Sequence, residues 1–288
     1  MATDSVDRSS LFSVEGLVAV VTGGGTGIGR MIATALENNG ATVYIVGRRL
    51  DVLEATAEKS SKYGKIFALQ GDVTSQDSLL AVVDTLRAKH GYVNLLVNNA
   101  GILFSMGERP IPRPGESIKE FQARLWNADT PESWAKTFEV NCTAPYFCTV
   151  AFLELLDAGN RQGGIEGVAS QVITVSSLGG FRRDAGTLSV GYSVSKAATN
   201  HLGKLLVNVL KDFKIRSNII CPGFYPSEMS SGLVPEDFAK KAIPIGRGGD
   251  IKDMGGLALF LASRAGAYVN GAVHITDGGE LGLYSSTY

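Results

Sequence analysis

Short apolar runs alternate along the chain with longer stretches in which apolar residues recur every three or four positions. The short runs, rich in Val and Ile, predict buried strands at residues 17–23, 41–47, 65–73 and 92–101. The stretches between them have the period of amphipathic helices and span residues 28–40, 50–64 and 75–91. Strands and helices that alternate in this way are joined by right-handed crossovers, so the pattern predicts a parallel sheet covered on both faces.

The periodicity pauses after the fourth strand. Residues 104–129 are rich in proline, glycine and charge, and they predict an inserted loop with one short helix. Beyond the insertion, helices are predicted at residues 130–159, 191–213 and 253–263, and strands at 170–177, 215–223 and 271–276. Because no repeat or linker separates independent cores, the prediction is one α/β domain over residues 1–288, with a doubly wound parallel sheet of about seven strands.

Composition and charge argue against several classes of partner. The formal net charge is -1 and no basic run is present, which argues against nucleic-acid binding. No apolar run is long enough to span a bilayer, and the opening residues lack the positive head and apolar centre of a signal peptide. We therefore expect a soluble cytoplasmic protein with no membrane partner.

Cysteine and histidine usage gives no sign of a metal site. The three cysteines, Cys142, Cys148 and Cys221, form no Cys-x2-Cys pair and lie in apolar surroundings, which is typical of buried reduced thiols. The three histidines are scattered without ligand spacing. We predict that the protein has no structural or catalytic metal.

Five glycines in ten residues follow the first predicted strand, in the stretch "VTGGGTGIGR". Gly23 stands at the tight turn, Gly27 where main chain would approach a pyrophosphate, and Gly29 where the next helix must pack closely on the strand. The N-terminus of that helix offers unpaired N–H groups and a partial positive charge to phosphate. With a strand before it and a helix after it, the motif predicts a dinucleotide-binding Rossmann fold, and the lack of a Gly-Lys-Ser/Thr sequence argues against a P-loop.

Motifs spread from about Val18 to Gly279 together resemble the classical short-chain dehydrogenase/reductase family, in particular its NADPH-dependent 3-oxoacyl and ketone reductases. They are the Gly-x3-Gly-x-Gly loop after a threonine, "NNAG" at residues 98–101, "VSS" ending at Ser177, "YSVSK" at 192–196 and "TDGG" near the end. The resemblance implies a nicotinamide cofactor. "GDV" looks like the family's adenine-contacting turn, and "PGFYPS" looks like its nicotinamide-contacting segment, with Ser227 where threonine is more usual. The residues that we predict to bind the cofactor are Gly23, Gly25, Thr26, Gly27, Ile28, Gly29, Arg48, Asp72, Val73, Asn99, Ala100, Gly101, Tyr192, Lys196, Pro222, Gly223, Tyr225 and Ser227.

The same resemblance implies four catalytic residues: Asn141, Ser177, Tyr192 and Lys196. A free tyrosine hydroxyl has a pKa near ~10, so a neighbouring cation is needed to favour its phenolate. Tyr192 and Lys196 are four residues apart on a predicted helix and therefore share a face. Tyr192 would exchange the proton and Ser177 would hydrogen-bond the substrate oxygen, although Ser176 stays an alternative at this position. Asn141 would hold a water linked to the lysine.

The end of the second strand indicates which cofactor is preferred. A Rossmann protein that binds NAD(H) carries an acidic residue there, which accepts hydrogen bonds from the ribose 2′-hydroxyl. This sequence has Gly47 instead, followed by Arg48 and Arg49, whose guanidinium groups suit a 2′-phosphate. We predict NADP(H), with NAD(H) left open as an alternative.

Three segments depart from the compact family pattern. The insertion, with Arg109, Arg113 and Trp126, is predicted to line either the substrate pocket or an oligomer contact. Residues 224–247 are predicted to form a substrate lid, whose Phe224, Tyr225, Met229 and Leu233 favour an apolar or mixed substrate. An additional segment, residues 280–288, has no role that the sequence reveals.

These patterns favour an NADPH-dependent carbonyl reductase that acts reversibly as a secondary-alcohol dehydrogenase on a ketone or 3-oxoacyl substrate. Two alternatives remain open: an NAD-linked alcohol dehydrogenase, and a non-catalytic protein that senses NADP(H). The apolar helices around residues 143–156 and 197–210 also suggest a homo-oligomer, either a dimer or a tetramer.

Overall fold

The computed structural model describes residues 6–105, 107–187, 189–228, 232 and 237–288. Its centre is a parallel seven-stranded sheet in the order β3-β2-β1-β4-β5-β6-β7. This confirms the predicted α/β class and the doubly wound Rossmann topology, in which the strand order reverses direction between β1 and β4. The strands are β1 (Val18–Thr22), β2 (Thr42–Gly47), β3 (Ile66–Gln70), β4 (Leu95–Asn98), β5 (Gln171–Val175), β6 (Arg216–Pro222) and β7 (Val273–Thr276).

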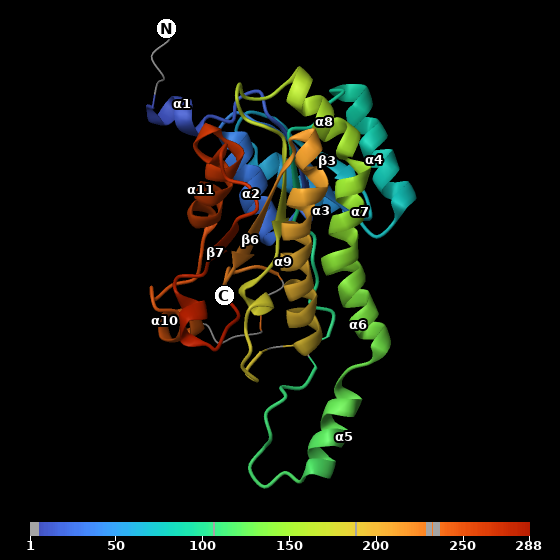
Figure 1. The fold of residues 1–288 in the computed structure, drawn as a ribbon, viewed down its shortest axis with the longest axis vertical. Coiled ribbons are helices and arrows are strands. Elements are labelled where there is room, and N and C mark those ends of the chain that lie inside the picture. Colours follow the sequence, from blue (N-terminus) through green and yellow to red (C-terminus); the bar gives the residue numbers. More distant parts are fainter. Residues whose placement is uncertain (1–5, 106, 188, 229–231, 233–236) are drawn as a thin grey trace.

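Helices cover both faces of the sheet, with α2 and α11 together on one side and α4, α7 and α8 on the other (Figure 1). The α-helices are α1 (Arg8–Phe12), α2 (Gly27–Asn38), α3 (Leu50–Ser60), α4 (Gln76–Lys89), α5 (Ile118–Ala128), α6 (Pro131–Phe138), α7 (Ala144–Ala151), α8 (Leu153–Gln162), α9 (Val190–Leu210), α10 (Phe238–Ala242) and α11 (Ile251–Ala262). The short helix α10 lies in the predicted lid, but Met229, Leu233 and the other lid residues at 230–231 and 234–236 lie outside the described residues.

The continuous apolar runs of the strands follow from this two-sided burial. Successive side chains of a strand point to opposite faces, so Ala19 and Val21 of β1 pack against α2 and α11, while Val18 and Val20 pack against α4 and α9. All four are buried. A strand buried on both faces needs apolar residues at every position, which is why it lacks the alternation of a half-exposed strand.

The helix predicted over residues 130–159 is divided in the structure. A π-helical turn, Glu139–Thr143, separates α6 from α7, and α8 begins after a further break at Phe152. Pro145 explains the first interruption, because proline has no N–H to donate to the carbonyl of Asn141 four residues earlier. The Thr199 hydroxyl of α9 donates to that carbonyl instead, at 2.7 Å.

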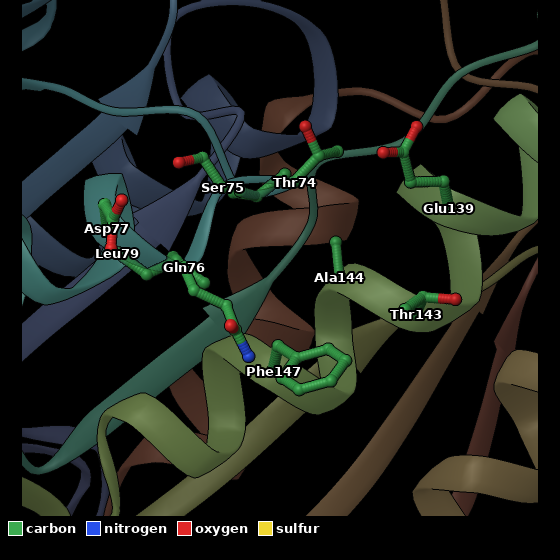
Figure 2. Close-up of a pocket in the computed structure, with 10 residues that line it drawn as sticks. Thr74, Ser75, Gln76, Asp77, Leu79, Glu139, Thr143, Ala144 and Phe147 are labelled. Atoms are coloured by element: carbon green, nitrogen blue, oxygen red, sulfur yellow. The ribbon is translucent and has the colours of Figure 1, made fainter.

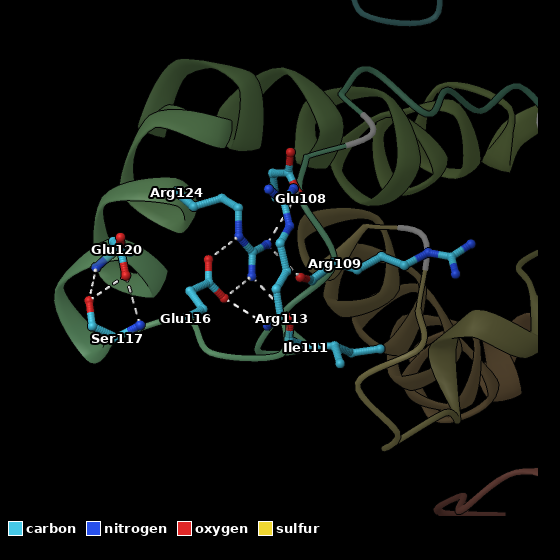
Figure 3. A network of polar contacts seen from close by, with 8 residues as sticks. All are labelled: Glu108, Arg109, Ile111, Arg113, Glu116, Ser117, Glu120 and Arg124. Atoms are coloured by element: carbon cyan, nitrogen blue, oxygen red, sulfur yellow. Dashed lines mark hydrogen bonds and ion pairs between the residues drawn. The ribbon is translucent and has the colours of Figure 1, made fainter.

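The insertion contains the predicted short helix, α5, which projects beyond the body of the protein (Figure 1). A polar network around Arg124 holds its base together, as Figure 3 shows. The Arg124 guanidinium contacts Glu116 at 2.8 Å and Glu108 at 3.1 Å, and it also donates to the carbonyls of Arg109 and Ile111. These contacts lower the pKa of Glu116 to about 2. Ion pairs and hydrogen bonds therefore hold the insertion together, since its helix α5 contains no buried residue.

The three insertion residues that the sequence placed at a pocket or an oligomer contact lie apart. Arg113 pairs with Glu108 at 3.1 Å, and the side chain of Arg109 extends away from the network (Figure 3). Trp126 is 80% exposed on α5. Their predicted roles in a pocket or an oligomer contact stay predictions.

Candidate active site

The glycine-rich loop turns tightly between β1 and α2. Gly23 and Gly27 have φ values of +64° and +50°, which side-chain-bearing residues rarely adopt. A Cβ at Gly29 would lie 2.3 Å from the carbonyl oxygen of Gly23, so any larger residue would force the helix away from the loop. The loop has the conformation that the motif predicted.

Thr22 and Asn99 join this loop to the "NNAG" turn after β4. The Thr22 hydroxyl accepts hydrogen bonds from the N–H groups of Asn99 (3.0 Å) and Ala100 (3.1 Å). In return, the Asn99 amide donates to the carbonyls of Thr22 (2.9 Å) and Gly23 (3.2 Å). In the sequence this threonine stands out only as the residue before the glycine motif. Its position at the end of β1, beside the adjacent strand β4, is what gives it this role.

The loop suits the pyrophosphate of a dinucleotide. Thr26 precedes α2 but makes no side-chain hydrogen bond to the first turn, so the N–H groups there are available to an anion. Above the loop, a Cβ at Gly27 would lie 3.1 Å from the Cβ of Ser227, which places the start of the predicted lid against it. Gly25 is fixed from the other side by the Thr56 hydroxyl, which donates to its carbonyl at 2.6 Å.

The ends of β2 and β3 carry the residues predicted at the adenosine end. Asp72 accepts hydrogen bonds from the N–H (2.9 Å) and hydroxyl (2.7 Å) of Thr74, and these bonds lower its pKa, with a smaller contribution from the positive charge of Arg48. Arg48 is exposed. Arg49 instead forms an ion pair with Glu228 of the lid segment at 2.9 Å, a contact between residues too far apart in the chain for the sequence to indicate.

Three of the four predicted catalytic side chains converge at the carboxyl ends of β5 and β6. The side chain of Ser177 lies near enough to that of Tyr192 to lower the pKa of the tyrosine. The Ser177 oxygen also accepts a bond from the N–H of Gly179 at 3.1 Å, which leaves the serine proton available for donation. Ser176 points the other way, because its buried hydroxyl donates to the main-chain carbonyl of Lys196 at 3.0 Å. The geometry therefore favours Ser177 over Ser176.

Lys196 is buried beneath this pair. Its ammonium donates to the carbonyl of Val175 at 3.1 Å and lies 5.8 Å from the centre of the Tyr192 ring. Burial lowers the pKa of Lys196 to about 8. A Cβ at Gly101 would lie 3.3 Å from the lysine nitrogen, so the "NNAG" turn passes close to the ammonium.

The pKa of Tyr192 differs from the sequence-based expectation. Part of its side chain remains accessible, but protein atoms surround the hydroxyl, and this burial raises its pKa above the usual value. The nearby Ser177 side chain lowers the pKa of Tyr192, with a smaller effect than burial. A lysine four residues away therefore does not by itself favour the phenolate, since desolvation of the charged form outweighs it.

Asn141 lies in the π-helical turn and fastens it to the neighbouring loop. Its side chain accepts from the N–H of Ile102 (2.8 Å) and donates to the carbonyl of the same residue (2.9 Å). A third bond, at 3.0 Å, reaches the hydroxyl of Ser195, next to Lys196. The structure thus brings Asn141 to the lysine through Ser195 and the adjacent loop.

The segment after β6 passes over the same edge of the sheet. Gly223 donates to the carbonyl of Thr276 at 3.0 Å, and a Cβ there would lie 2.6 Å from that of Asp277. Tyr225, predicted to bind the cofactor, has its ring in the core and its hydroxyl 2.6 Å from that of Thr276. Because this side chain is buried, the main chain of Tyr225 is the part that could contact a cofactor.

A groove of about 480 Å³ lies beside the Asp72–Val73 turn, between the start of α4 and the π-helical turn with α7 (Figure 2). Thr74, Gln76 and Asp77 form one wall and Phe147 the other. None of the converging residues Ser177, Tyr192 and Lys196 lines it. The groove is therefore not the pocket that the sequence predicts for the substrate.

Two further findings concern metals and membranes. Within the residues that the structure describes, no group of three or more His, Cys, Asp or Glu side chains is arranged to hold a metal ion. Over the same residues, no helix has the length and apolar character needed to cross a bilayer.

Comparisons with known proteins agree with this arrangement. A family model described as enoyl-(acyl carrier protein) reductase matches residues 23–280. The short-chain dehydrogenase/reductase PhomF of Diaporthe leptostromiformis is 47% identical over 294 residues, which cover 99% of this chain and 98% of that protein. The rhamnolipids biosynthesis 3-oxoacyl-(acyl-carrier-protein) reductase of Pseudomonas aeruginosa is 33% identical over 272 residues, which cover 93% of this chain and 97% of that protein.

Among solved structures, the Pseudomonas aeruginosa RhlG/NADP active-site complex is similar to this chain with a TM-score of 0.81 and 31% identity. The match covers 94% of this chain and 99% of the other.

Proposed function

Because the chain belongs to the classical short-chain dehydrogenase/reductase family of oxidoreductases, we propose that it is an NADP(H)-dependent carbonyl reductase. Its substrate is a ketone or a 3-oxoacyl compound, and the reaction is reversible toward oxidation of a secondary alcohol. The observation that carries this proposal is the convergence of Ser177, Tyr192 and Lys196 at the edge of the sheet next to the glycine loop. A sensor of NADP(H) would have no use for a phenol placed beside a serine and a buried lysine.

The residues act on the substrate oxygen in this proposal. The serine proton, which Gly179 leaves free, is donated to the carbonyl oxygen and stabilises the negative charge that develops there. The Tyr192 phenol gives that oxygen its proton, and its raised pKa keeps the proton available at neutral pH. Lys196 stabilises the phenolate that remains, and Asn141 holds the turn beside the lysine. Bound NADPH supplies the hydride.

The preference for NADP(H) rests on the end of β2. Gly47 stands where an NAD(H)-binding protein has an acidic residue, and the next two residues, Arg48 and Arg49, are both exposed. A guanidinium can form two parallel hydrogen bonds with a phosphate, whereas an acidic residue would repel it. The relative solved with NADP also supports this preference.

The test is NADPH oxidation with a panel of ketones, diketones and 3-oxoacyl esters, using wild type and Tyr192→Phe and repeating each assay with NADH. We expect wild-type turnover that prefers NADPH, and a loss of about 10²-fold or more in Tyr192→Phe, since the variant keeps the ring but has no proton to give. Turnover that prefers NADH would favour the NAD-linked alternative. Tight NADPH binding without reduction of any carbonyl would favour the non-catalytic alternative.

A further inference from the structure

Residues 284–288, called here the strap, run antiparallel to the start of the loop that joins Ser177 to α9. Arg182 and Ser286 form an isolated antiparallel bridge. The N–H of Arg183 donates to the carbonyl of Ser285 at 2.8 Å, and the N–H of Thr287 donates to the carbonyl of Phe181 at 2.9 Å. In Figure 1 the end marked C accordingly lies beside the yellow segment that leads into α9.

Side chains reinforce this pairing. The Arg182 guanidinium lies 3.7 Å from the centre of the Tyr284 ring, which is the geometry of a cation–π contact. Asp184 fixes the same guanidinium from the other side through two hydrogen bonds, at 2.8 and 2.6 Å. The rings of Phe181 and Tyr288 meet edge to face with centroids 5.2 Å apart. The strap thus contacts three successive loop residues through main chain, charge and aromatic surface.

The loop that the strap holds, residues 178–187, is the chain segment between the two proposed catalytic hydroxyls. Its Gly179 N–H orients the Ser177 oxygen. A Cβ at Gly179 would lie 3.4 Å from that oxygen and 3.6 Å from Cε1 of Tyr192, so the loop backbone runs alongside both reacting side chains. At its far end, the Thr187 hydroxyl bonds that of Ser193 on α9 at 2.6 Å. A shift of the loop would therefore move the wall beside the site.

We propose that the strap positions the loop of residues 178–187 and so determines how the carbonyl substrate is seated against Ser177 and Tyr192. Tyr284 is its principal positioning residue, acting through Arg182. The contacts of the strap described above join it to residues 181–183, which follow Ser177, and none of these contacts involves the glycine loop or Arg48. It therefore acts on the substrate and leaves cofactor binding unchanged. This inference rests on the proposed function.

Two variants test it by steady-state kinetics at saturating NADPH: deletion of residues 284–288, and Tyr284→Ala. We expect the KM for the carbonyl to rise about tenfold, equivalent to a loss of roughly 1.4 kcal/mol of uniform substrate binding, with kcat falling less than about threefold. The dissociation constant of NADPH, measured by fluorescence titration, should stay within about twofold of wild type.

Tyr284→Phe provides the rescue, because it keeps the ring that faces Arg182 and loses only the hydroxyl. Tyr268→Ala is the matched control, since Tyr268 is fully exposed and outside the site. We expect a wild-type KM from both. An unchanged KM in the deletion and in Tyr284→Ala, or an equal weakening of NADPH binding, overturns the proposal.

Hydrogen–deuterium exchange of the NADPH-saturated protein tests, without turnover, whether the strap holds the loop of residues 178–187. Deleting residues 284–288 should speed amide exchange in residues 179–186 by about tenfold and leave the strands β4–β6 unchanged. Unchanged exchange in residues 179–186 overturns the proposal. If wild type reduces no carbonyl, the proposed function fails, and the exchange result still shows whether the strap holds the loop.

Discussion

Burial shifts the pKa values of two neighbouring side chains in opposite directions at this site. It raises that of Tyr192 and lowers that of Lys196 to about 8, because in each case the charged form is desolvated. A phenol that keeps its proton is suited to act as an acid toward a carbonyl oxygen. The lysine nevertheless remains mainly cationic at neutral pH, so it can stabilise the phenolate after the proton has been given.

These shifts predict the pH dependence of carbonyl reduction. Lys196 is cationic below pH about 8 and becomes neutral above it, whereas Tyr192 stays protonated well beyond that pH. The kcat at saturating NADPH should therefore be constant from about pH 6 to 7 and fall above pH about 8 as the lysine loses its charge. A kcat that stays constant up to pH about 10 would contradict this role of the lysine.

The two arginines after β2 differ in how their charge is compensated. Arg49 is paired with Glu228, while Arg48 is exposed, and the interaction recorded for its charge within the described residues is a contribution to lowering the pKa of Asp72. We expect Arg48→Ala to weaken NADPH binding about tenfold or more and NADH binding by less than about twofold. Arg49→Ala is the matched variant. It should weaken NADPH binding less than Arg48→Ala does, since the Arg49 guanidinium already has a carboxylate partner in Glu228. Equal losses for both dinucleotides, measured by titration, would show that Arg48 does not contact the 2′-phosphate.

At the level of elements, Pro145 and the buried Arg216 each shape a contact between neighbouring elements. Pro145 opens the π-helical turn that presents Asn141 to α9. On the other face, the guanidinium of Arg216, at the start of β6, donates to the carbonyls of Gly266 (3.1 Å), Val269 (3.0 Å) and Leu261 (3.2 Å). It joins β6 to the end of α11 and the turn that follows it.

This arginine is the basis of a stability prediction. Arg216 is 5% exposed, and burial lowers its pKa to about 10. Arg216→Met should reduce the free energy of unfolding by about 3 kcal/mol, because the carbonyls of Gly266, Val269 and Leu261 each lose a hydrogen bond from the buried guanidinium. The control is Arg264→Ala: Arg264 is exposed and donates once, to the Gly167 carbonyl, so its loss should cost less than about 1 kcal/mol. Chemical denaturation measures the free energy of unfolding of both variants. Equal values for Arg216→Met and Arg264→Ala would refute a special stabilising role for Arg216.

At the level of the whole molecule, apolar side chains remain exposed on two helices of one face. On α9 they are Val194 (44%), Leu205 (51%) and Val209 (60%), which share one helix face, and on α7 they include Tyr146 (43%) and Val150 (44%). Monomers in water rarely expose large contiguous apolar patches, so exposed apolar side chains on neighbouring turns of a helix suggest a contact surface. The surface suits a second copy of the chain related by a two-fold axis.

We therefore expect Leu205→Asp to convert the wild-type oligomer into a smaller species, because the new carboxylate would be desolvated in a self-complementary interface. Light scattering after size-exclusion chromatography measures the mass, with Tyr268→Ala as a control that should keep the wild-type mass. A monomeric wild type, or an unchanged mass for Leu205→Asp, would argue against this face.

Local sequence determined much of this protein. The order of strands and helices follows from hydrophobic period, and the loop at Gly23, Gly27 and Gly29 follows from the conformations that only glycine tolerates. Placing Lys196 one helical turn after Tyr192 likewise needs nothing beyond the α-helix. Each of these features depends on residues that are close together in the chain.

Only the tertiary structure decided the features that join distant residues. The choice of Ser177 over Ser176 depends on α9 packing beside β5, which occupies the Ser176 hydroxyl with the Lys196 carbonyl. The raised pKa of Tyr192 depends on the protein atoms around its hydroxyl, which no spacing along the chain reveals. The strap pairs Arg182 with Ser286 across about a hundred residues. Such contacts form only when the whole fold closes, because their energy depends on burial and partners that the folded chain supplies.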